Sequence, residues 1–415
     1  MEVDIPYGKG KIRANVPEPC EVLIPNKIEV EDENKIIKGA LRNPIGMIPF
    51  QEFVTNSERL LIIVNDASKP TPTPRILEHI HQLIKNHPDV KFLVATGTHK
   101  PPGEEECRFI FGRFYDIFKE QIYIHDSKKE EDMNYYGKTA SGTEIYLNKM
   151  IEDAENIIVI GSVEPHYFAG YTGGRKAILP GVASYETIET NHKFALDEKS
   201  CSLCLEDNPI HKDFNDAVKL LKDINIFSIQ TVLTNDYKIY STKCGDIIKS
   251  FDESIKYAND VYSVPVTKKG NIVITVVPYP MDINLYQSQH ALENGKLVLE
   301  DDGVLILVSK CRMGVGNDAF VEMLSKADSE QGVMDLIGGK YKLGCHKSVK
   351  ILRIISENQI FAVTDLDEDT IKKTKLKPYS DIQTAINDAV DYIESRGKKP
   401  NTIVIQSGNL TVPLI

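Results

Sequence analysis

Short apolar runs alternate with amphipathic segments along the first half of the chain. Leu60–Val64 is an uninterrupted apolar run of strand length, whereas Arg75–Lys85 repeats its apolar residues at helical spacing. The same pattern predicts strands at Lys91–Ala95, Gln121–Ile124 and Asn156–Ile160 and a helix at Glu104–Lys119. This order of strands and helices indicates a mainly parallel sheet with helices on both faces.

A second series of the same kind begins near Gly270. Its predicted strands are Asn271–Val277, Gly303–Val308, Gln359–Thr364 and Thr402–Ile405, and its predicted helices are Asn284–Asn294, Lys347–Ser356 and Asp381–Ser395. The turn-rich segment Ser263–Gly270 separates the two series. We therefore expect an α/β fold of two domains, with mainly parallel, Rossmann-like sheets and an interdomain active-site cleft.

The boundary between the two domains is predicted after residue 266. Residues 1–266 are expected to form a cofactor-binding domain, and residues 267–399 a second domain that closes over the substrate. Because a lone strand near the C-terminus needs a sheet to join, residues 400–415 are expected to return to the first domain.

Composition narrows the functional classes. Hydrophobic residues make up 41% and charged residues 26% of the 415 residues, which is typical of a globular protein. The net charge is 49 − 60 = −11, which argues against a nucleic-acid coat or a membrane-surface protein. No apolar run is long enough to span a membrane, and the N-terminus lacks the features of a signal peptide. Seven cysteines are few and odd in number, so we expect a cytoplasmic protein with reduced thiols.

Polar loops follow three of the predicted strands. Asp66, Ser68 and Lys69 follow the first strand, His99 follows the second, and Gly161–Lys176 follows the strand at 156–160. Ligands of open α/β sheets bind beyond the carboxyl ends of the strands, so these loops are expected to meet at one edge. Each loop alone is explained by turns and helix caps, but three together favour a binding site.

The glycine-rich segment Gly170–Lys176 is not a phosphate-binding P-loop. Arg175 precedes its lysine and Ala177 follows, where a P-loop has Gly and then Ser or Thr. Its glycines would still let backbone N–H groups approach an anion, with Arg175 as a charge partner. No GxGxxG motif follows a strand, so the usual NAD fingerprint is absent.

Two cysteines lie downstream in a CxxC pair. Cys201 and Cys204 stand between His192 and His211, and these four residues could bind zinc. The spacing matches no standard zinc finger, and a pair of reduced thiols is the alternative. Both interpretations stay open at this point.

Several motifs together carry a family resemblance. They are Asp66–Pro70, Ala95–Pro101, Glu164–Gly181, Asn191–His192, Asn208–Asp213 and Tyr286–Gln287. In this order they resemble the nickel-dependent lactate racemase family over nearly the whole chain. The resemblance implies two α/β domains closing over a nickel-pincer nucleotide, a pyridinium mononucleotide with a thioamide and a thiocarboxylate. It also implies an isomerase that racemises or epimerises a 2-hydroxy acid.

The resemblance implies roles for individual residues. Lys176 corresponds to the lysine joined covalently to the cofactor, His192 to the nickel ligand, and His99 with His166 to the acid/base pair. The other cofactor-binding residues that it implies are Asp66, Ser68, Gly173, Gly174 and Arg175. The substrate-binding residues that it implies are Lys69, Tyr286, Gln287, His290 and His346. The implied partners are the small-molecule 2-hydroxy acid and cofactor-maturation enzymes, and a homo-oligomer stays open.

Three positions depart from the pattern of that family. Lys69 stands where the family has Arg, so a cation is kept but the bidentate fork is lost. His290 stands where the family has Lys, and His346 or its neighbour where it has Trp. These more polar walls favour a substrate that is larger or more polar than lactate.

The chemistry of a 2-hydroxy acid favours hydride transfer over proton abstraction. A carbanion beside a carboxylate is too unstable for a histidine to form. If one histidine takes the hydroxyl proton while a hydride leaves, the product is a planar 2-keto acid that can be reduced on either face. Two histidines on opposite sides, with the near-neutral pKa that is usual for histidine, serve this scheme.

Two other functions remain as alternatives. His99, His166 and His192 could hold a metal ion with an open position, as in a metal-dependent hydrolase or lyase that acts on an anionic metabolite. A protein that binds or carries an anionic metabolite without reaction is the non-enzymatic alternative.

Overall fold

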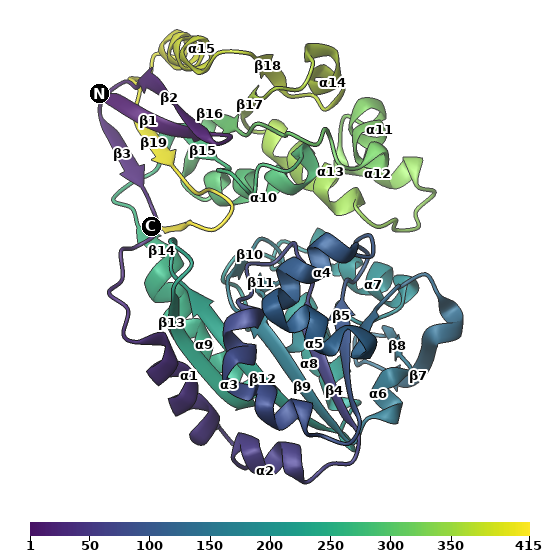
Figure 1. Cartoon of the computed structure of the whole chain (residues 1–415). Coiled ribbons are helices and arrows are strands. Elements are labelled where there is room, and N and C mark those ends of the chain that lie inside the picture. The colour runs from purple at the N-terminus through teal and green to yellow at the C-terminus, as the bar shows by residue number, and fades with distance from the viewer. The chain divides into compact units, whose positions relative to one another are not determined.

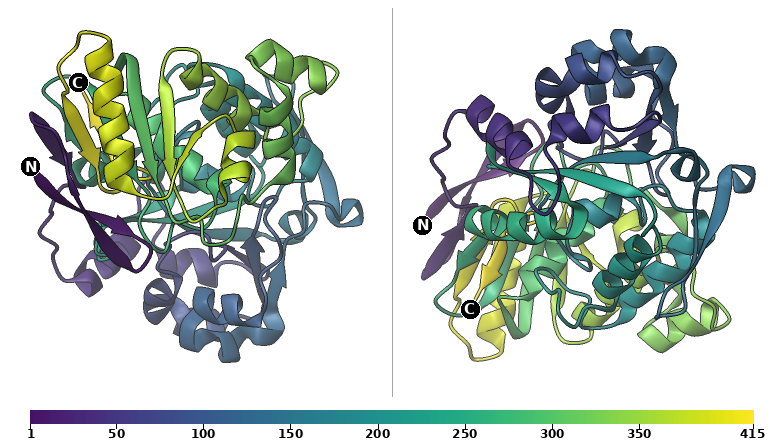
Figure 2. Two further views of the ribbon diagram at one scale, coloured as in Figure 1. Left: turned by 90° about the horizontal axis from the view of Figure 1, so that it is seen from above. Right: turned by 90° about the horizontal axis from the view of Figure 1, so that it is seen from below.

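The computed structural model describes residues 1–415. The chain divides into two compact units: a continuous unit of residues 27–261, and a split unit of residues 1–26 and 262–415. Both are α/β assemblies (Figures 1 and 2). None of the helices is both long enough and apolar enough to cross a membrane.

The continuous unit is built on a six-stranded sheet. In spatial order its strands are β13 (Ile239–Asp246), β12 (Asn225–Leu233), β9 (Asn156–Ser162), β4 (Leu60–Asn65), β5 (Val90–Ala95) and β6 (Ile122–Ile124). All neighbours are parallel except β12 and β13. The strands predicted in this region are confirmed, with ends that differ by at most two residues. The strands β12 and β13 were not predicted.

Helices cover both faces of this sheet. They are α1 (Glu33–Arg42), α2 (Phe50–Thr55), α3 (Thr73–Lys85), α4 (Glu104–Phe111), α5 (Tyr115–Phe118), α6 (Met150–Asp153), α7 (Tyr185–His192), α8 (Pro209–Lys219) and α9 (Ile247–Tyr262). Successive residues of β4 are buried whichever way they point, which requires cover on both sides. The single helix predicted at 104–119 is instead α4 and α5, because Gly112 adopts a φ of 56° and ends the first.

The strand order reverses between β4 and β9. From β4 the chain runs to β5 and β6 on one side, whereas β9 leads to β12 and β13 on the other. The loops that follow β4 and β9 therefore diverge and leave a crevice at the carboxyl ends of the strands. Open α/β sheets bind their ligands at such a switch point.

The split unit has a second six-stranded sheet, and all of its strands are parallel. Their order is β18 (Lys377–Tyr379), β17 (Gln359–Val363), β16 (Leu299–Val308), β15 (Gly270–Val276), β19 (Thr402–Ile405) and β3 (Cys20–Leu23). Its helices are α10 (Leu285–Lys296), α11 (Asp318–Lys326), α12 (Glu330–Leu336), α13 (Cys345–Ile355), α14 (Glu368–Lys373) and α15 (Ile382–Ser395). The predicted strands and helices of the second series are confirmed, with ends shifted by a few residues.

The expectation that residues 400–415 join the first domain is wrong. β19 lies between β15 and β3 in the sheet of the split unit, and β20 (Val412–Leu414) pairs with β14 (Ser263–Pro265). The first 26 residues also belong here, because the hairpin of β1 (Glu2–Tyr7) and β2 (Gly10–Asn15) packs into the same core. The chain thus divides after residues 26 and 261, not once after residue 266.

Candidate active site

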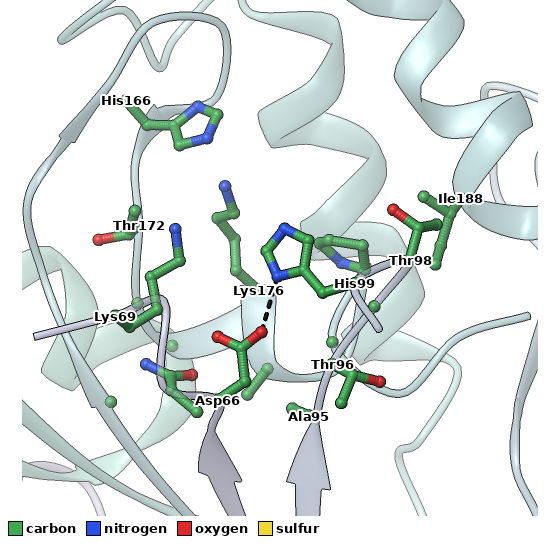
Figure 3. Close-up of a pocket in the computed structure, with 18 of the residues that line it drawn as sticks. Asp66, Lys69, Ala95, Thr96, Thr98, His99, His166, Thr172, Lys176 and Ile188 are labelled. Atoms are coloured by element: carbon green, nitrogen blue, oxygen red, sulfur yellow. Dashed lines mark hydrogen bonds and ion pairs between the residues drawn. The ribbon is translucent and has the colours of Figure 1, made fainter. Parts of the chain in front are cut away.

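A cavity of about 150 Å³ lies at the crevice of the continuous unit, where the loops after β4, β5 and β9 meet (Figure 3). The predicted site residues that line it are Asp66, Lys69, His99, His166, Gly173, Gly174, Lys176 and His192. Thr98, Phe168 and Thr172 line it as well, within the motifs that carry the resemblance, and so does Asn65, which opens the loop after the first predicted strand, whereas nothing in the sequence singled out Ile188. The prediction that these three loops meet at one sheet edge is therefore confirmed.

Asp66 and His99 form a hydrogen-bonded pair in this cavity (Figure 3). His99 Nδ1 lies 2.7 Å from Asp66 Oδ2, and the Ser68 hydroxyl donates to Oδ1 at 2.6 Å. Burial raises the pKa of Asp66, but the hydrogen bonds from His99 and Ser68 and the charge of Lys69 outweigh it, so the pKa lies below its ordinary value. An ionised carboxylate only accepts, so Nδ1 of His99 carries a proton and Nε2 is its acceptor nitrogen.

His166 lies on the short hairpin of β10 (Pro165–His166) and β11 (Gly170–Tyr171). Its ring stacks on Tyr167 at 5.2 Å and meets the edge of Phe168 at 4.4 Å between ring centroids. The Ala169 N–H donates to Nδ1 of His166 at 3.3 Å. This contact favours a neutral ring with its proton on Nε2, so the two histidines are held in opposite tautomers.

The hairpin that carries His166 depends on glycine at position 170. Gly170 has a φ of 76°, and a Cβ there would lie 2.3 Å from the carbonyl oxygen of Cys204. The Leu203 N–H donates to the carbonyl of Gly170 at 3.2 Å. The loop with the CxxC pair therefore lies directly against the loop that positions His166.

Lys176 lies on a 3₁₀ turn, Gly174–Ala177, and keeps some exposure toward the cavity. Protein atoms otherwise surround its amine, and this burial lowers the pKa of Lys176 well below its ordinary value. The charges of Lys69 and Arg175 lower it further, and Glu164 opposes them. Lys69 and Lys176 both extend toward the end of the cavity where His166 lies (Figure 3). This lowering of the pKa favours the neutral form of the amine, which is the form that acts as a nucleophile.

Arg175 is wholly buried and does not line the cavity. Its guanidinium lies 3.7 Å from the ring centroid of Phe251, and Nη2 lies 2.6 Å from Nδ1 of His211. Burial lowers the pKa of Arg175 to about 9, with Asp252 opposing, so the group is still charged at neutral pH. Arg175 is predicted to bind the cofactor, and that role stays a prediction. The structure shows it off the cavity lining, where its charge lowers the pKa of Lys176.

Gly173 and Gly174 give the loop its shape. Their φ values are 88° and 50°, and a Cβ on Gly173 would lie 2.6 Å from Cγ2 of Val163. The N–H of Gly174 already donates to the side-chain oxygen of Gln230 at 2.7 Å. The interpretation of this segment as a cradle of free N–H groups for an anion is therefore not supported at Gly174.

His192 is the last residue of α7 and lines the cavity. Its Nδ1 lies 3.2 Å from Oδ1 of Asn191, and its ring meets the edge of Phe168 at 5.1 Å between centroids. Phe168 thus lies between the rings of His166 and His192 and within 5.6 Å of the Lys176 amine. These contacts bring the three polar groups to one apolar wall.

No group of three His, Cys, Asp or Glu residues in the chain is arranged to hold a metal ion. This finding counts against the three-histidine hydrolase site and against zinc at the CxxC pair. Cys201 and Cys204 form a disulfide, and a turn in which Leu203 has a φ of 64° brings the two residues together. The expectation of reduced thiols is therefore wrong for this pair. The other five cysteines are free thiols.

The cavity nevertheless fits a metal that arrives with most of its own ligands. His192 offers one imidazole, and the depressed pKa of Lys176 makes its amine available for a covalent bond. The family resemblance implies a nickel-pincer nucleotide, which would bring a carbon and two sulfurs as ligands and would take one histidine and one lysine from the protein. The donor set of the cavity matches that requirement.

The predicted substrate residues of the second series lie in the split unit. Tyr286, Gln287 and His290 are on the first turns of α10, where the Asn284 side chain accepts from the Gln287 N–H at 2.8 Å. His346 is the second residue of α13 and is buried, with Nδ1 2.6 Å from the Tyr341 hydroxyl. Their roles in substrate binding stay predictions.

Comparison with known proteins gives a consistent result. Residues 7–202 match the family model of the lactate racemase N-terminal domain, and residues 266–412 match that of the lactate racemase C-terminal domain. A lactate racemase from Thermoanaerobacterium thermosaccharolyticum is 31% identical over 414 residues, which covers 95% of this chain and 96% of the relative. A lactate racemase from Lactiplantibacillus plantarum is 31% identical over 352 residues, 81% of each chain.

Solved structures show the same relationship. The lactate racemase apoprotein from T. thermosaccharolyticum superposes with a TM-score of 0.91 at 28% sequence identity, and all of both chains is covered. A protein from Thermotoga maritima superposes with a TM-score of 0.70 at 15% identity, covering 92% of this chain and 98% of that one. The latter shares the fold alone.

Proposed function

The chain belongs to the lactate racemase family, and from this membership we propose that it interconverts the two configurations of a 2-hydroxy acid with a nickel-pincer nucleotide. It is an isomerase of the racemase type. The observation that carries the proposal is one cavity in which Lys176, with its depressed pKa, lies with His99, His166 and His192.

His99 is suited to take the hydroxyl proton from one enantiomer of the substrate. Asp66 accepts from its Nδ1–H, which leaves Nε2 to receive the proton, and the carboxylate stabilises the imidazolium that forms. His166 is proposed to serve the enantiomer of the opposite hand. Because the Ala169 amide favours the Nε2–H tautomer, His166 is prepared to donate at Nε2 once its ring is protonated.

Lys176 and His192 are the residues proposed to hold the cofactor. The Lys176 amine would form the covalent bond, which requires the neutral state that burial and the neighbouring cations favour. His192 would supply the protein's ligand to nickel. When bound, the nickel-pincer nucleotide supplies a centre that accepts a hydride from the substrate's α-carbon and returns it. The enzymes that make this cofactor are the proposed partners.

Lys69 is proposed to bind the substrate carboxylate. It lines the cavity, and its charge acts on both Asp66 and Lys176. A single ammonium attracts a carboxylate without imposing the two-point geometry of a guanidinium. Because His290 and His346 stand where the pattern of the family has Lys and Trp, we propose an acid that is larger or more polar than the lactate for which the relatives are named.

A stereochemical assay of the cofactor-loaded enzyme tests this function. The protein is produced together with cofactor-synthesis enzymes and incubated with each pure enantiomer of lactate, malate-like acids and sugar acids, and the products are separated on a chiral column. We expect inversion of at least one acid, and no inversion and no cofactor mass on the chain in Lys176→Ala. A loaded enzyme that binds these acids and inverts none of them would favour the carrier alternative.

A further inference from the structure

A buried carboxylate, that of Asp213, lies on α8 and is held by neutral hydrogen-bond donors. The side chain of Asp213 is fully buried and takes part in none of the ion pairs of the chain. Thr139 donates to Oδ1 at 2.5 Å, and Thr143 and Asn191 donate to Oδ2 at 2.8 Å each. A buried carboxylate held only by neutral donors is costly, so its presence here calls for a reason.

The two threonines explain how the carboxylate is tolerated. They flank the turn between β7 (Met133–Lys138) and β8 (Glu144–Asn148), and the Thr139 hydroxyl oxygen accepts the backbone N–H of Thr143 at 3.1 Å. The hydroxyl proton of Thr139 is then directed to Asp213. Both hydroxyls belong to residues of this turn, and they are charge-assisted donors that stabilise an ionised acceptor.

The third donor connects the carboxylate to the cavity. Asn191 is fully buried, and its amide nitrogen points to Asp213. An ionised carboxylate can only accept hydrogen bonds. If the Asn191 amide were rotated by 180°, its oxygen would face Oδ2 of Asp213 and the hydrogen bond would be lost. Its oxygen Oδ1 is therefore presented to the other side, where it lies 3.2 Å from Nδ1 of His192.

This orientation selects one tautomer of His192. An amide oxygen accepts, so Nδ1 of His192 must carry the proton, and Nε2 keeps the lone pair that a metal needs. If the amide were reversed, its NH₂ group would face Nδ1 and favour the opposite tautomer. Histidines that bind metals are commonly fixed in this way by a carboxylate or carbonyl on the far side of the ring.

We propose that Asp213 is a positioning residue which, through Asn191, holds His192 as the Nδ1–H tautomer with Nε2 as its metal-binding nitrogen. The part of this inference that concerns nickel rests on the proposed function. The part that concerns the tautomer rests on the hydrogen bonds alone and can be tested without the cofactor.

The first test is a ¹⁵N NMR measurement of the histidine rings in the ligand-free full-length chain, at a pH well above the ordinary histidine pKa of about 6.5. The His192 signals are assigned by their loss in His192→Gln. We expect a protonated Nδ1 and an unprotonated Nε2 in the wild-type protein. A wild-type protein with the proton on Nε2 of His192 would overturn the proposal without any variant of Asp213.

Variants then isolate the role of the carboxylate. Asp213→Leu leaves no acceptor for Asn191, so both tautomers of His192 should be populated. Asp213→Asn can keep one oxygen toward Asn191 and should largely restore the Nδ1–H form. Thr143→Val removes a donor from the same carboxylate but leaves the bond to Asn191, and it should behave like the wild type. A folded Asp213→Leu protein with an unchanged His192 tautomer would contradict the proposal.

Nickel retention separates this inference from the proposed function. In the loaded enzyme, Asp213→Leu should retain nickel ~10–100-fold less tightly, while mass spectrometry still finds the nucleotide on Lys176. Asp213→Asn should recover most of the loss. If the tautomer changes as expected and nickel retention does not, the positioning role of Asp213 is supported and the assignment of His192 as the nickel ligand is wrong.

Discussion

At the scale of single residues, the cavity holds an amine and a carboxylate whose pKa values are both lowered. Burial, Lys69 and Arg175 lower the pKa of Lys176, whereas His99, Ser68 and Lys69 overcome the effect of burial on Asp66. Both shifts favour the neutral amine and the charged carboxylate. Nucleophilic attachment and histidine orientation both require these states.

The lowered pKa of Lys176 predicts how stability depends on pH. Between this pKa and the unfolded value of about 10.4, the unfolded chain binds one proton more than the folded chain, so stability rises with pH. In ligand-free Lys176→Met this contribution disappears, and the slope should fall by up to about 1.4 kcal/mol per pH unit, the value for one proton. Urea denaturation at a series of pH values measures it.

The matched control is an exposed lysine on α8. Lys212→Met removes a surface amine whose side chain is 55% exposed and pairs loosely with Asp207. It should leave the slope of stability against pH unchanged. Equal slopes in Lys176→Met and Lys212→Met would show that burial does not lower the pKa of Lys176.

The Asp66–His99 pair gives a prediction for catalysis. In Asp66→Asn the amide can donate to Nδ1 and favour the wrong tautomer of His99, so kcat should fall by ~10²–10⁴-fold with a smaller change in KM. Because the folded pKa of Asp66 is lowered, its stabilising effect is complete above the unfolded pKa of about 3.9 and is lost as the pH falls through the folded value. The variant should lack that acid-sensitive contribution.

Ser68→Ala is the control for this pair. It removes one hydrogen bond to Asp66 but leaves the charge and the contact with His99. Its kcat should lie much closer to that of the wild type than that of Asp66→Asn. Steady-state kinetics of all three proteins with the preferred acid would decide, and equal losses in both variants would argue against a special role for the carboxylate.

Residue positions were predictable where a motif follows a strand, and side-chain direction was not. His99, His166 and Lys176 lie on loops that follow strands and line one cavity, as predicted, and His192, which the family resemblance singled out, lines it too. Arg175 precedes Lys176 in the same 3₁₀ turn, but its guanidinium lies against the ring of Phe251. Adjacent residues in such a turn point in different directions, and periodicity contains no information about which one faces the cavity.

At the scale of elements, the hairpin of β10 and β11 predicts a consequence for Gly170. Gly170→Ala meets both a φ of 76° and a Cβ that would lie 2.3 Å from the Cys204 carbonyl oxygen. The positive φ alone costs about 1–2 kcal/mol, and the contact forces the backbone to move as well. We expect a loss of unfolding free energy greater than 2 kcal/mol and a shifted NMR environment for His166, measured by urea denaturation and ring NMR.

Gly142→Ala separates the two causes. Gly142 also has a positive φ, of 91°, but the nearest atom to its Cβ is Cε of Lys138 at 3.8 Å. This variant should lose only the ~1–2 kcal/mol of backbone strain and leave the His166 signals in place. If both variants lose the same free energy, the contact with the Cys204 loop does not constrain the hairpin.

The apolar periodicity predicted most strands and helices, and it failed where a local feature interrupted the pattern. Gly112 splits the helix expected at 104–119. β12 contains Ser228, Gln230 and Thr231, all buried, so its polar residues hide a core strand from a search for apolar runs. Gln230 accepts from Gly174, which explains in physical terms why a polar side chain is kept there.

At the scale of the whole molecule, the assignment of strands to sheets could not be predicted from local pattern. β3 and β19 pair in register, Cys20 with Thr402 and Leu23 with Ile405, although nearly the whole chain lies between them in sequence. Any free sheet edge of suitable length would satisfy a lone terminal strand equally well. The composition of the last strand indicates that it is buried, but it does not indicate which sheet receives it.

This pairing predicts which pieces of the chain fold alone. Residues 27–261 contain a complete sheet with helices on both faces and should fold as an isolated fragment. Residues 262–415 lack β3 and the β1–β2 hairpin. Three buried side chains of the missing segment, Val3, Ile5 and Val16, contribute roughly 1.5–3 kcal/mol each. Their loss is comparable with the whole stability of a domain, about 5–15 kcal/mol, so this fragment should not fold.

A third fragment tests whether the missing N-terminal strands are the reason that residues 262–415 do not fold. Joining residues 1–26 to residues 262–415 through a flexible linker restores β3 beside β19 and the hairpin against the core, and it should recover cooperative unfolding. Circular dichroism and urea denaturation of the three fragments compare them. If residues 262–415 fold equally well with and without residues 1–26, the N-terminal strands are an accessory to this unit, and β19 can form a stable sheet edge unaided.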